Sequence, residues 1–208
     1  MTATVLLLDP RWPTLIPLHL AGRISGQVAF TPEVPVDVRW ALDTAIGEHR
    51  WLISTDPDDP EVLRWQREGA ETERVASLAD PVLQATRTMH AARRRGEWEQ
   101  EMTHQSLLPY LREEAEEVAD AIEGGLPSDA LKSELADLLL QILFHAEIAS
   151  EGGAFDFSDV AGAFVQKMRR RAPYLFDGST GLVDKATQDR LWAEGKAQEA
   201  DSQSEQQK

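Results

Sequence analysis

The spacing of apolar residues along the chain changes near residue 79. Before that point, short apolar or alternating runs such as TVLLL, GQVAF and RWLIS are separated by turn sequences such as DPRWP and DPDDP. The same segment holds seven of the eleven prolines. Short runs broken by proline and aspartate are typical of strands and turns. The pattern therefore predicts a small α/β or β-rich unit over residues 1–78, with a helix only near residues 58–69.

From residue 79 the apolar positions recur every three to four residues, which predicts helices. The expected helices cover residues 81–95, 106–123, 129–150, 157–171 and 187–199. Gly124 and Gly152 stand where two of them should end, and Ser128 stands where one should begin. The sequence thus predicts a mainly α protein whose larger part, residues 79–200, is a helical bundle. The polar stretch 201–208 has too few apolar residues to pack and is expected to be disordered.

Carboxylates interrupt the second of these helices, whose pattern is otherwise apolar on one side. In LREEAEEVADAI, residues 111–122, a rotation of about 100° per residue puts Glu114 in the middle of the apolar face. Glu117 lies at the edge of that face, and Glu113 points toward the polar side. Burying a carboxylate costs stability unless it is neutralised, paired or bound to a cation. Glu114 therefore requires a partner.

The third helix, within LKSELADLLLQILFHAEIA, is apolar on nearly every side, which indicates a central helix. Its polar exceptions form one narrow stripe at about 100° per residue: Glu134, Asp137, Gln141 and His145. A solvated face would usually mix basic with acidic residues, and this stripe contains neither lysine nor arginine.

The two helices thus each offer a pair of acids three residues apart, on faces that could meet inside a bundle. The pairs are Glu114 with Glu117 and Glu134 with Asp137. Such pairs project from one side of a helix and supply the oxygen ligands that Mg²⁺ or Mn²⁺ prefers. Two solvated acidic faces would be the alternative. The expected burial of Glu114 favours a metal site.

Composition narrows the range of partners. A net charge of −15 opposes binding to the backbone of DNA or RNA, so no nucleic-acid polymer is expected as a partner. Cysteine is absent, which excludes disulfides and zinc-thiolate sites and fits a cytoplasmic protein. No apolar run approaches the ~20 residues of a membrane helix, so no membrane association is expected. Two basic triplets, Arg93–Arg95 and Arg169–Arg171, are taken on their own as solvated helix ends.

The sequence EEAEE followed by ELAD resembles the EExxE…ExxD signature of MazG-type nucleoside triphosphate pyrophosphohydrolases, which belong to the all-α NTP pyrophosphatase superfamily. The flanking segments THQSLLPYLREEAEEVADAIEGG, SELADLLLQILFHAEIA, FDFSDV and KMRRRAP are similar to MazG segments in the same order. The resemblance covers roughly residues 96–176. It implies a helical NTP-pyrophosphatase-like bundle.

The resemblance also implies roles for individual residues. The metal ligands would be Glu114, Glu117, Glu134 and Asp137, and Glu113 would be a further ligand or the base that orients water. Phosphate would be held by the K-x-x-R-R residues Lys167, Arg170 and Arg171. The segment EWEQEMTH departs from the usual family pattern but keeps Trp98, which could either stack on a nucleotide base or belong to the core. His104 and His145 are expected to be hydrogen-bonded structural residues.

The activity implied is Mg²⁺-dependent hydrolysis of ribo- or deoxyribonucleoside triphosphates between the α- and β-phosphates, with clearance of damaged nucleotides as a role. One alternative is a helical binding or scaffold module whose site is degenerate. Another is an enzyme of narrow specificity, such as a dUTPase or a phosphoribosyl-ATP pyrophosphatase. A helix that is apolar on nearly all sides is hard to cover within one chain, so a homo-oligomer, a dimer in the simplest case, is expected.

Overall fold

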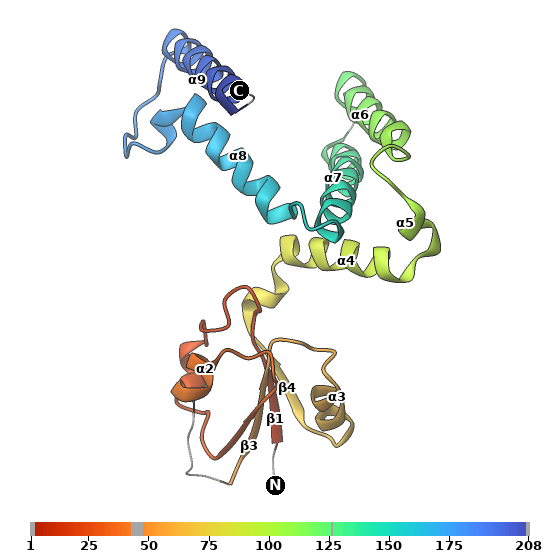
Figure 1. Cartoon of the computed structure of the whole chain (residues 1–208), viewed down its shortest axis with the longest axis vertical. Coiled ribbons are helices and arrows are strands. Elements are labelled where there is room, and N and C mark those ends of the chain that lie inside the picture. Colours follow the sequence, from red (N-terminus) through yellow and green to blue (C-terminus); the bar gives the residue numbers. More distant parts are fainter. Residues whose placement is uncertain (1–2, 43–47, 126, 207–208) are drawn as a thin grey trace. The chain divides into compact units, whose positions relative to one another are not determined.

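The fold was analysed in a computed structural model, which describes residues 3–42, 48–125 and 127–206 (Figure 1). The chain divides into two compact units, residues 1–87 and 88–208. This division falls inside helix α4 (Pro81–Arg95), later than the predicted boundary at residue 79.

The first unit contains a four-stranded parallel sheet with strand order β2-β3-β1-β4. The strands are β1 (Ala3–Leu7), β2 (Gln27–Phe30), β3 (Arg50–Ser54) and β4 (Glu71–Arg74). They alternate with the helices α1 (Leu18–Ala21), α2 (Val36–Ala41) and α3 (Pro60–Arg67), and a 3₁₀ turn, η1 (Ala76–Ala79), follows β4. Strands that alternate with helices make this an α/β unit, one of the two predicted possibilities.

Both faces of this sheet are buried, as is usual for parallel sheets. Because side chains alternate along a strand, Leu6 points to the face covered by α2, where it packs in a cluster with Val38. Val5 points to the opposite face and packs with Val62 and Trp65 of α3. Figure 1 shows α2 and α3 on opposite sides of the sheet. The near-continuous apolar runs TVLLL and RWLIS are therefore the two central strands.

Polar residues at the carboxyl ends of the strands form hydrogen bonds with one another. Asp9, which follows β1 and is 2% exposed, accepts hydrogen bonds from Arg11, and these lower its pKa to about 2. Burial alone would raise the pKa of Glu33, but hydrogen bonds from Thr31, the Thr55 amide and Ser54 lower it to about 2. These networks tie together the loops that follow the strands.

The second unit is helical, as predicted. After α4 come α5 (Glu97–Glu101), α6 (Leu108–Glu123), α7 (Ser128–Glu151), α8 (Phe157–Arg171), the 3₁₀ turn η2 (Pro173–Leu175) and α9 (Lys185–Gln206). The five predicted helices are present. The pattern missed the short helix α5, and α9 continues to Gln206, into the stretch expected to be a polar tail. None of the helices in the described ranges is long and apolar enough to cross a membrane.

Helices α6 and α7 pack side by side as a hairpin (Figure 1). Gly125 follows α6 at a φ of 61°, a left-handed conformation in which glycine is favoured. The prediction that α7 is buried on most sides is wrong for the single chain, because α6 and the neighbouring helices cover only part of its surface. Large apolar side chains of α7 that remain exposed are Leu135, Leu139, Leu140 and Ile142.

Helices α8 and α9 approach each other closely at Gly195. A β-carbon built on Gly195 would lie 2.7 Å from the backbone oxygen of Arg170, well inside contact distance. Glycine inside a helix costs about 1 kcal/mol relative to alanine, and the close crossing accounts for its use here. This crossing brings Glu199 of α9 to the basic end of α8.

Candidate active site

The acids singled out from the sequence lie on the two helices of the α6–α7 hairpin. Glu114 and Glu117 are on α6, and Glu134 and Asp137 are on α7. Glu114, Glu134 and Asp137 are half-buried, whereas Glu113 and Glu117 are exposed. Glu114 is thus less enclosed than its place on the apolar face of α6 suggested.

The electrostatics of Glu114 show that these carboxylates converge. Its pKa is raised, first by burial and then by the negative charges of four neighbours: Asp137, Glu117, Glu113 and Glu134. Two of these neighbours belong to α7, so the packing of the hairpin brings the two signature segments together. Burial and like charges both oppose ionisation of Glu114. A cation placed among the carboxylates would relieve that opposition.

The carboxylates are not closed around an ion-sized position. Among the described residues, no three histidine, cysteine, aspartate or glutamate side chains stand close enough to hold a metal ion. The chemistry of the set nevertheless fits Mg²⁺ or Mn²⁺, since every donor is a carboxylate oxygen. Magnesium also commonly uses one or two carboxylates together with water and substrate phosphates.

Aromatic side chains meet at the same hairpin. Trp98 of α5 contacts Tyr110 of α6 and Phe144 of α7 edge-on, with ring centroids 5.8 and 5.9 Å apart. Trp98 is 48% exposed, so one part of its indole packs on the hairpin while the rest remains accessible. Both interpretations of Trp98 therefore remain compatible with its position.

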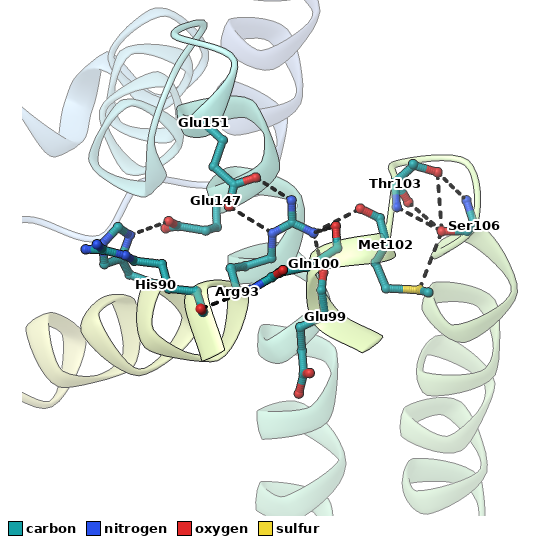
Figure 2. Close-up of polar contacts among 10 residues, drawn as sticks. His90, Arg93, Glu99, Gln100, Met102, Thr103, Ser106, Glu147 and Glu151 are labelled. Atoms are coloured by element: carbon teal, nitrogen blue, oxygen red, sulfur yellow. Dashed lines mark hydrogen bonds and ion pairs between the residues drawn. The ribbon is translucent and has the colours of Figure 1, made fainter. Parts of the chain in front are cut away.

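The segment that carries Trp98 is held by a buried arginine that the sequence analysis did not single out (Figure 2). Arg93 of α4, 7% exposed, donates hydrogen bonds to the backbone oxygens of Glu99, Gln100 and Met102 at the end of α5. It also donates to both carboxylate oxygens of Glu151 at the end of α7. The prediction that Arg93 belongs to a solvated helix end is wrong, because α5 folds back over it.

Two further contacts tie this region to α7. The Nδ1 atom of His90 lies 2.6 Å from Oε1 of Glu147 (Figure 2). His104 and His145 stack with ring planes 11° apart, and their Nδ1 atoms are 2.8 Å apart. Burial and the charge of His104 lower the pKa of His145. His104 and His145 are hydrogen-bonded to each other, as expected, and a structural role for them stays a prediction.

The basic residues of α8 form a separate group. Lys167 is exposed and lines a groove with Phe155 and Phe164. Arg170 Nε donates to Glu199 of α9 over 3.1 Å, and Arg171 donates to the other oxygen of the same carboxylate. The second triplet is therefore partly paired rather than solvated.

Arg171 also lies over the ring of Trp192, and Arg169 lies 4.4 Å above that of Phe176. Within the described part of the chain, no hydrogen bond or ion pair joins the basic residues of α8 to the acids of α6 and α7. Arg170 and Arg171 of the expected phosphate-binding set are instead paired with Glu199 of α9.

Comparison with known proteins finds a matching domain family for a segment of each unit. Residues 102–176 match the MazG nucleotide pyrophosphohydrolase domain, and residues 3–73 match the MazG N-terminal domain. The chain therefore belongs to the MazG family. The matched segment 102–176 contains the five acids predicted to form the site and the basic end of α8.

Two relatives compared by sequence agree with this assignment. A nucleoside triphosphate pyrophosphohydrolase of Mycobacterium tuberculosis is 39% identical over 208 residues, which cover 94% of this chain and 62% of that protein. A nucleoside triphosphate pyrophosphohydrolase/pyrophosphatase MazG of Thermotoga maritima is 45% identical over 103 residues, or 50% of this chain and 38% of that protein. The crystal structure of a mazG-related protein from Thermotoga maritima aligns with a TM-score of 0.48 at 24% identity, covering 55% of this chain and 97% of that one. The chain thus spans about three fifths of the length of the mycobacterial relative.

Proposed function

We propose that the chain hydrolyses nucleoside triphosphates between the α- and β-phosphates, in the cytoplasm, and releases a nucleoside monophosphate and pyrophosphate. The observation that carries the proposal is the convergence of Glu113, Glu117, Glu134 and Asp137 on the half-buried Glu114. A strongly acidic protein binds an anionic substrate only if a cation or a basic group comes between them. The two relatives, a nucleoside triphosphate pyrophosphohydrolase and a nucleoside triphosphate pyrophosphohydrolase/pyrophosphatase, support the same reaction.

Glu114, Glu117, Glu134 and Asp137 would hold Mg²⁺, or Mn²⁺ in its place. The bound ion would supply positive charge to the phosphate oxygens and lower the pKa of a water molecule. Glu113, exposed beside this group, would orient the attacking water and take its proton. The oxygen of the attacking water would bond to the α-phosphorus. The bond between the α-phosphorus and the α–β bridging oxygen would break at the same time, and pyrophosphate would leave with the electron pair of that bond.

Lys167, Arg170 and Arg171 would hold the departing pyrophosphate. The pairing of Arg170 and Arg171 with Glu199 does not exclude this role, because a guanidinium has five N–H donors and Glu199 can occupy at most two on each. The remaining donors are suited to planar or bidentate contact with phosphate.

The direct test is pyrophosphate release by the intact chain from the eight standard ribo- and deoxyribonucleoside triphosphates and from oxidised or deaminated ones. We expect release that requires Mg²⁺ or Mn²⁺ and stops when EDTA is added. Higher turnover on the altered nucleotides would support a role in clearing damaged nucleotides. Turnover of one substrate alone would support a narrow-specificity enzyme. No release by folded protein supplied with Mg²⁺ would contradict the proposal and favour a binding module.

We further propose that the helical unit assembles as a homodimer. The exposed apolar side chains of α7 are followed by Phe155, just before α8, and by Phe164 and Val165 on α8. Water-exposed apolar surface of this extent on adjacent helices is typical of a contact surface. Light scattering at micromolar concentration should give about twice the 23.2 kDa mass of one chain. A mass equal to one chain would contradict a dimer.

A further inference from the structure

Gln141 is a buried polar residue that the proposed mechanism leaves without a role. It lies on α7 four residues beyond Asp137, about 6 Å further along the helix axis. The residue is 4% exposed, and its Oε1 atom makes no hydrogen bond to any described residue. Buried side-chain oxygens nearly always have a hydrogen-bond partner, because burial removes the water that would otherwise satisfy them. Oε1 of Gln141 is thus an acceptor available to a partner from outside the described residues.

Contacts on either side fix where Gln141 lies in the hairpin. On one side, Asp137 is close enough to Glu114 of α6 to raise its pKa. On the other side, His145 of α7 contacts His104, just before α6. Asp137, Gln141 and His145 recur every four residues and share one side of α7, so Gln141 belongs to the side that faces α6. It stands between the acids and the histidine pair.

Aromatic rings occupy the same level of the hairpin. Phe144, one turn beyond Gln141, contacts Trp98, and Trp98 also contacts Tyr110, one turn before Glu114 on α6. Trp98 and Tyr110 are both partly exposed. Trp98 thus offers a partly exposed indole, and Gln141 offers an unsatisfied amide oxygen one helical turn from the acids. Together they are suited to bind a flat apolar ring that carries N–H or O–H donors, such as a nucleoside.

We propose that Gln141 is a specificity-determining residue: its carboxamide oxygen accepts a hydrogen bond from an N–H or O–H group of the nucleoside while the triphosphate lies at the acids. The inference rests on the proposed function. The donor belongs either to the base, as an amino or ring N–H group, or to the sugar, as a hydroxyl. Either donor would form the same hydrogen bond to Oε1. Pairs of nucleotides that differ in one such donor distinguish the base from the sugar.

The test compares the wild-type chain with Gln141→Leu, which has similar size and no polar group. We expect KM for the best substrate to rise about tenfold or more, with kcat within about threefold, since a contact to the nucleoside removes binding energy. Loss of preference between CTP and UTP would place the donor on the base. Loss of preference between ATP and dATP would place it on the sugar. The melting temperature without nucleotide should stay the same or rise.

Gln84→Leu, an exposed glutamine of α4, is the matched control and should leave KM and both preferences unchanged. The inference fails if Gln141→Leu keeps wild-type KM and preferences, or if activity falls only in proportion to unfolded protein. Calorimetric titration with α,β-methylene analogues of the same nucleotides separates this failure from failure of the proposed function. A wild-type chain that binds an analogue but releases no pyrophosphate from the corresponding natural nucleotide contradicts the function, and the affinity of Gln141→Leu for that analogue still decides the role of Gln141.

Discussion

Glu114→Gln is expected to lower pyrophosphate release by about 100-fold or more, even at raised Mg²⁺. Glutamine keeps the size and hydrogen-bonding capacity of glutamate but removes one negative charge from the metal-binding group. Loss of a residue that merely supports a metal ligand typically costs 10–100-fold in affinity or activity, so loss of a ligand should cost at least as much. The measurement is the initial rate of pyrophosphate release over a series of Mg²⁺ concentrations.

Without metal the same variant should be as stable as the wild type or more stable. The pKa of Glu114 is raised by burial and by neighbouring carboxylates, so the wild-type fold is disfavoured when Glu114 ionises. Its contribution to stability is fully present below the ordinary glutamate pKa of about 4.3 and is lost as pH rises through the raised value. In EDTA, the melting temperature of Glu114→Gln should therefore exceed that of the wild type at pH 7, and the difference should close toward pH 4.

Adding Mg²⁺ should raise the melting temperature of the wild type and have little effect on Glu114→Gln, because a ligand stabilises the state that binds it. Glu116→Gln is the matched control, since Glu116 is exposed on the same helix and lies outside the group that acts on Glu114. It should behave as wild type in all three measurements. Near-normal Mg²⁺-dependent turnover by Glu114→Gln would show that α6 does not supply the metal ligand we assign to it.

The helical half of the fold could be predicted because its signals are local. Periodicity placed α4, α6, α7 and α8 to within a few residues, since apolar spacing and glycine stops act within a turn or two of helix. The parallel sheet could not be derived in the same way. Its central pair joins Ala3 to Arg50, and such a register depends on contacts between residues far apart in sequence. Proline-rich connections identified the unit but left its α/β class open.

The candidate site likewise combines features that local sequence signals predict with features that depend on contacts between distant residues. Helical rotation alone aligned Glu134 with Asp137 and set Glu114 on the side of α6 that meets them, and the raised pKa of Glu114 agrees with that convergence. The exposed apolar surface of α7 agrees with a helix that is apolar on nearly every side, but periodicity shows only which side chains avoid water and not which chain covers them. Arg93 was missed because a basic triplet at a helix end is ordinarily solvated. Its burial depends on α5 folding back, which no local pattern indicates.

The second large effect is expected for Arg93→Met, which keeps an apolar stem but removes the guanidinium. Three backbone oxygens at the end of α5 and the carboxylate of Glu151 would lose their donor (Figure 2). Breaking a buried ion pair from one side typically costs 3–5 kcal/mol. Glu151 retains access to water, so we expect the lower end of that range, about 3 kcal/mol, in the free energy of unfolding of the helical unit.

Denaturant unfolding with tryptophan fluorescence measures this loss, because Trp98 lies on the segment that Arg93 holds. Arg95→Met, an exposed neighbour in the same triplet, is the control and should change stability by no more than about 0.5 kcal/mol. Hydrogen bonds from Arg93 lower the pKa of Glu151, so this pairing stabilises the fold above the ordinary glutamate pKa and is lost as pH falls through the lowered value. The stability gap between wild type and Arg93→Met should therefore narrow in acid. A gap that is small at pH 7 or constant with pH would mean that water replaces the guanidinium, and that α5 is held by its aromatic contacts alone.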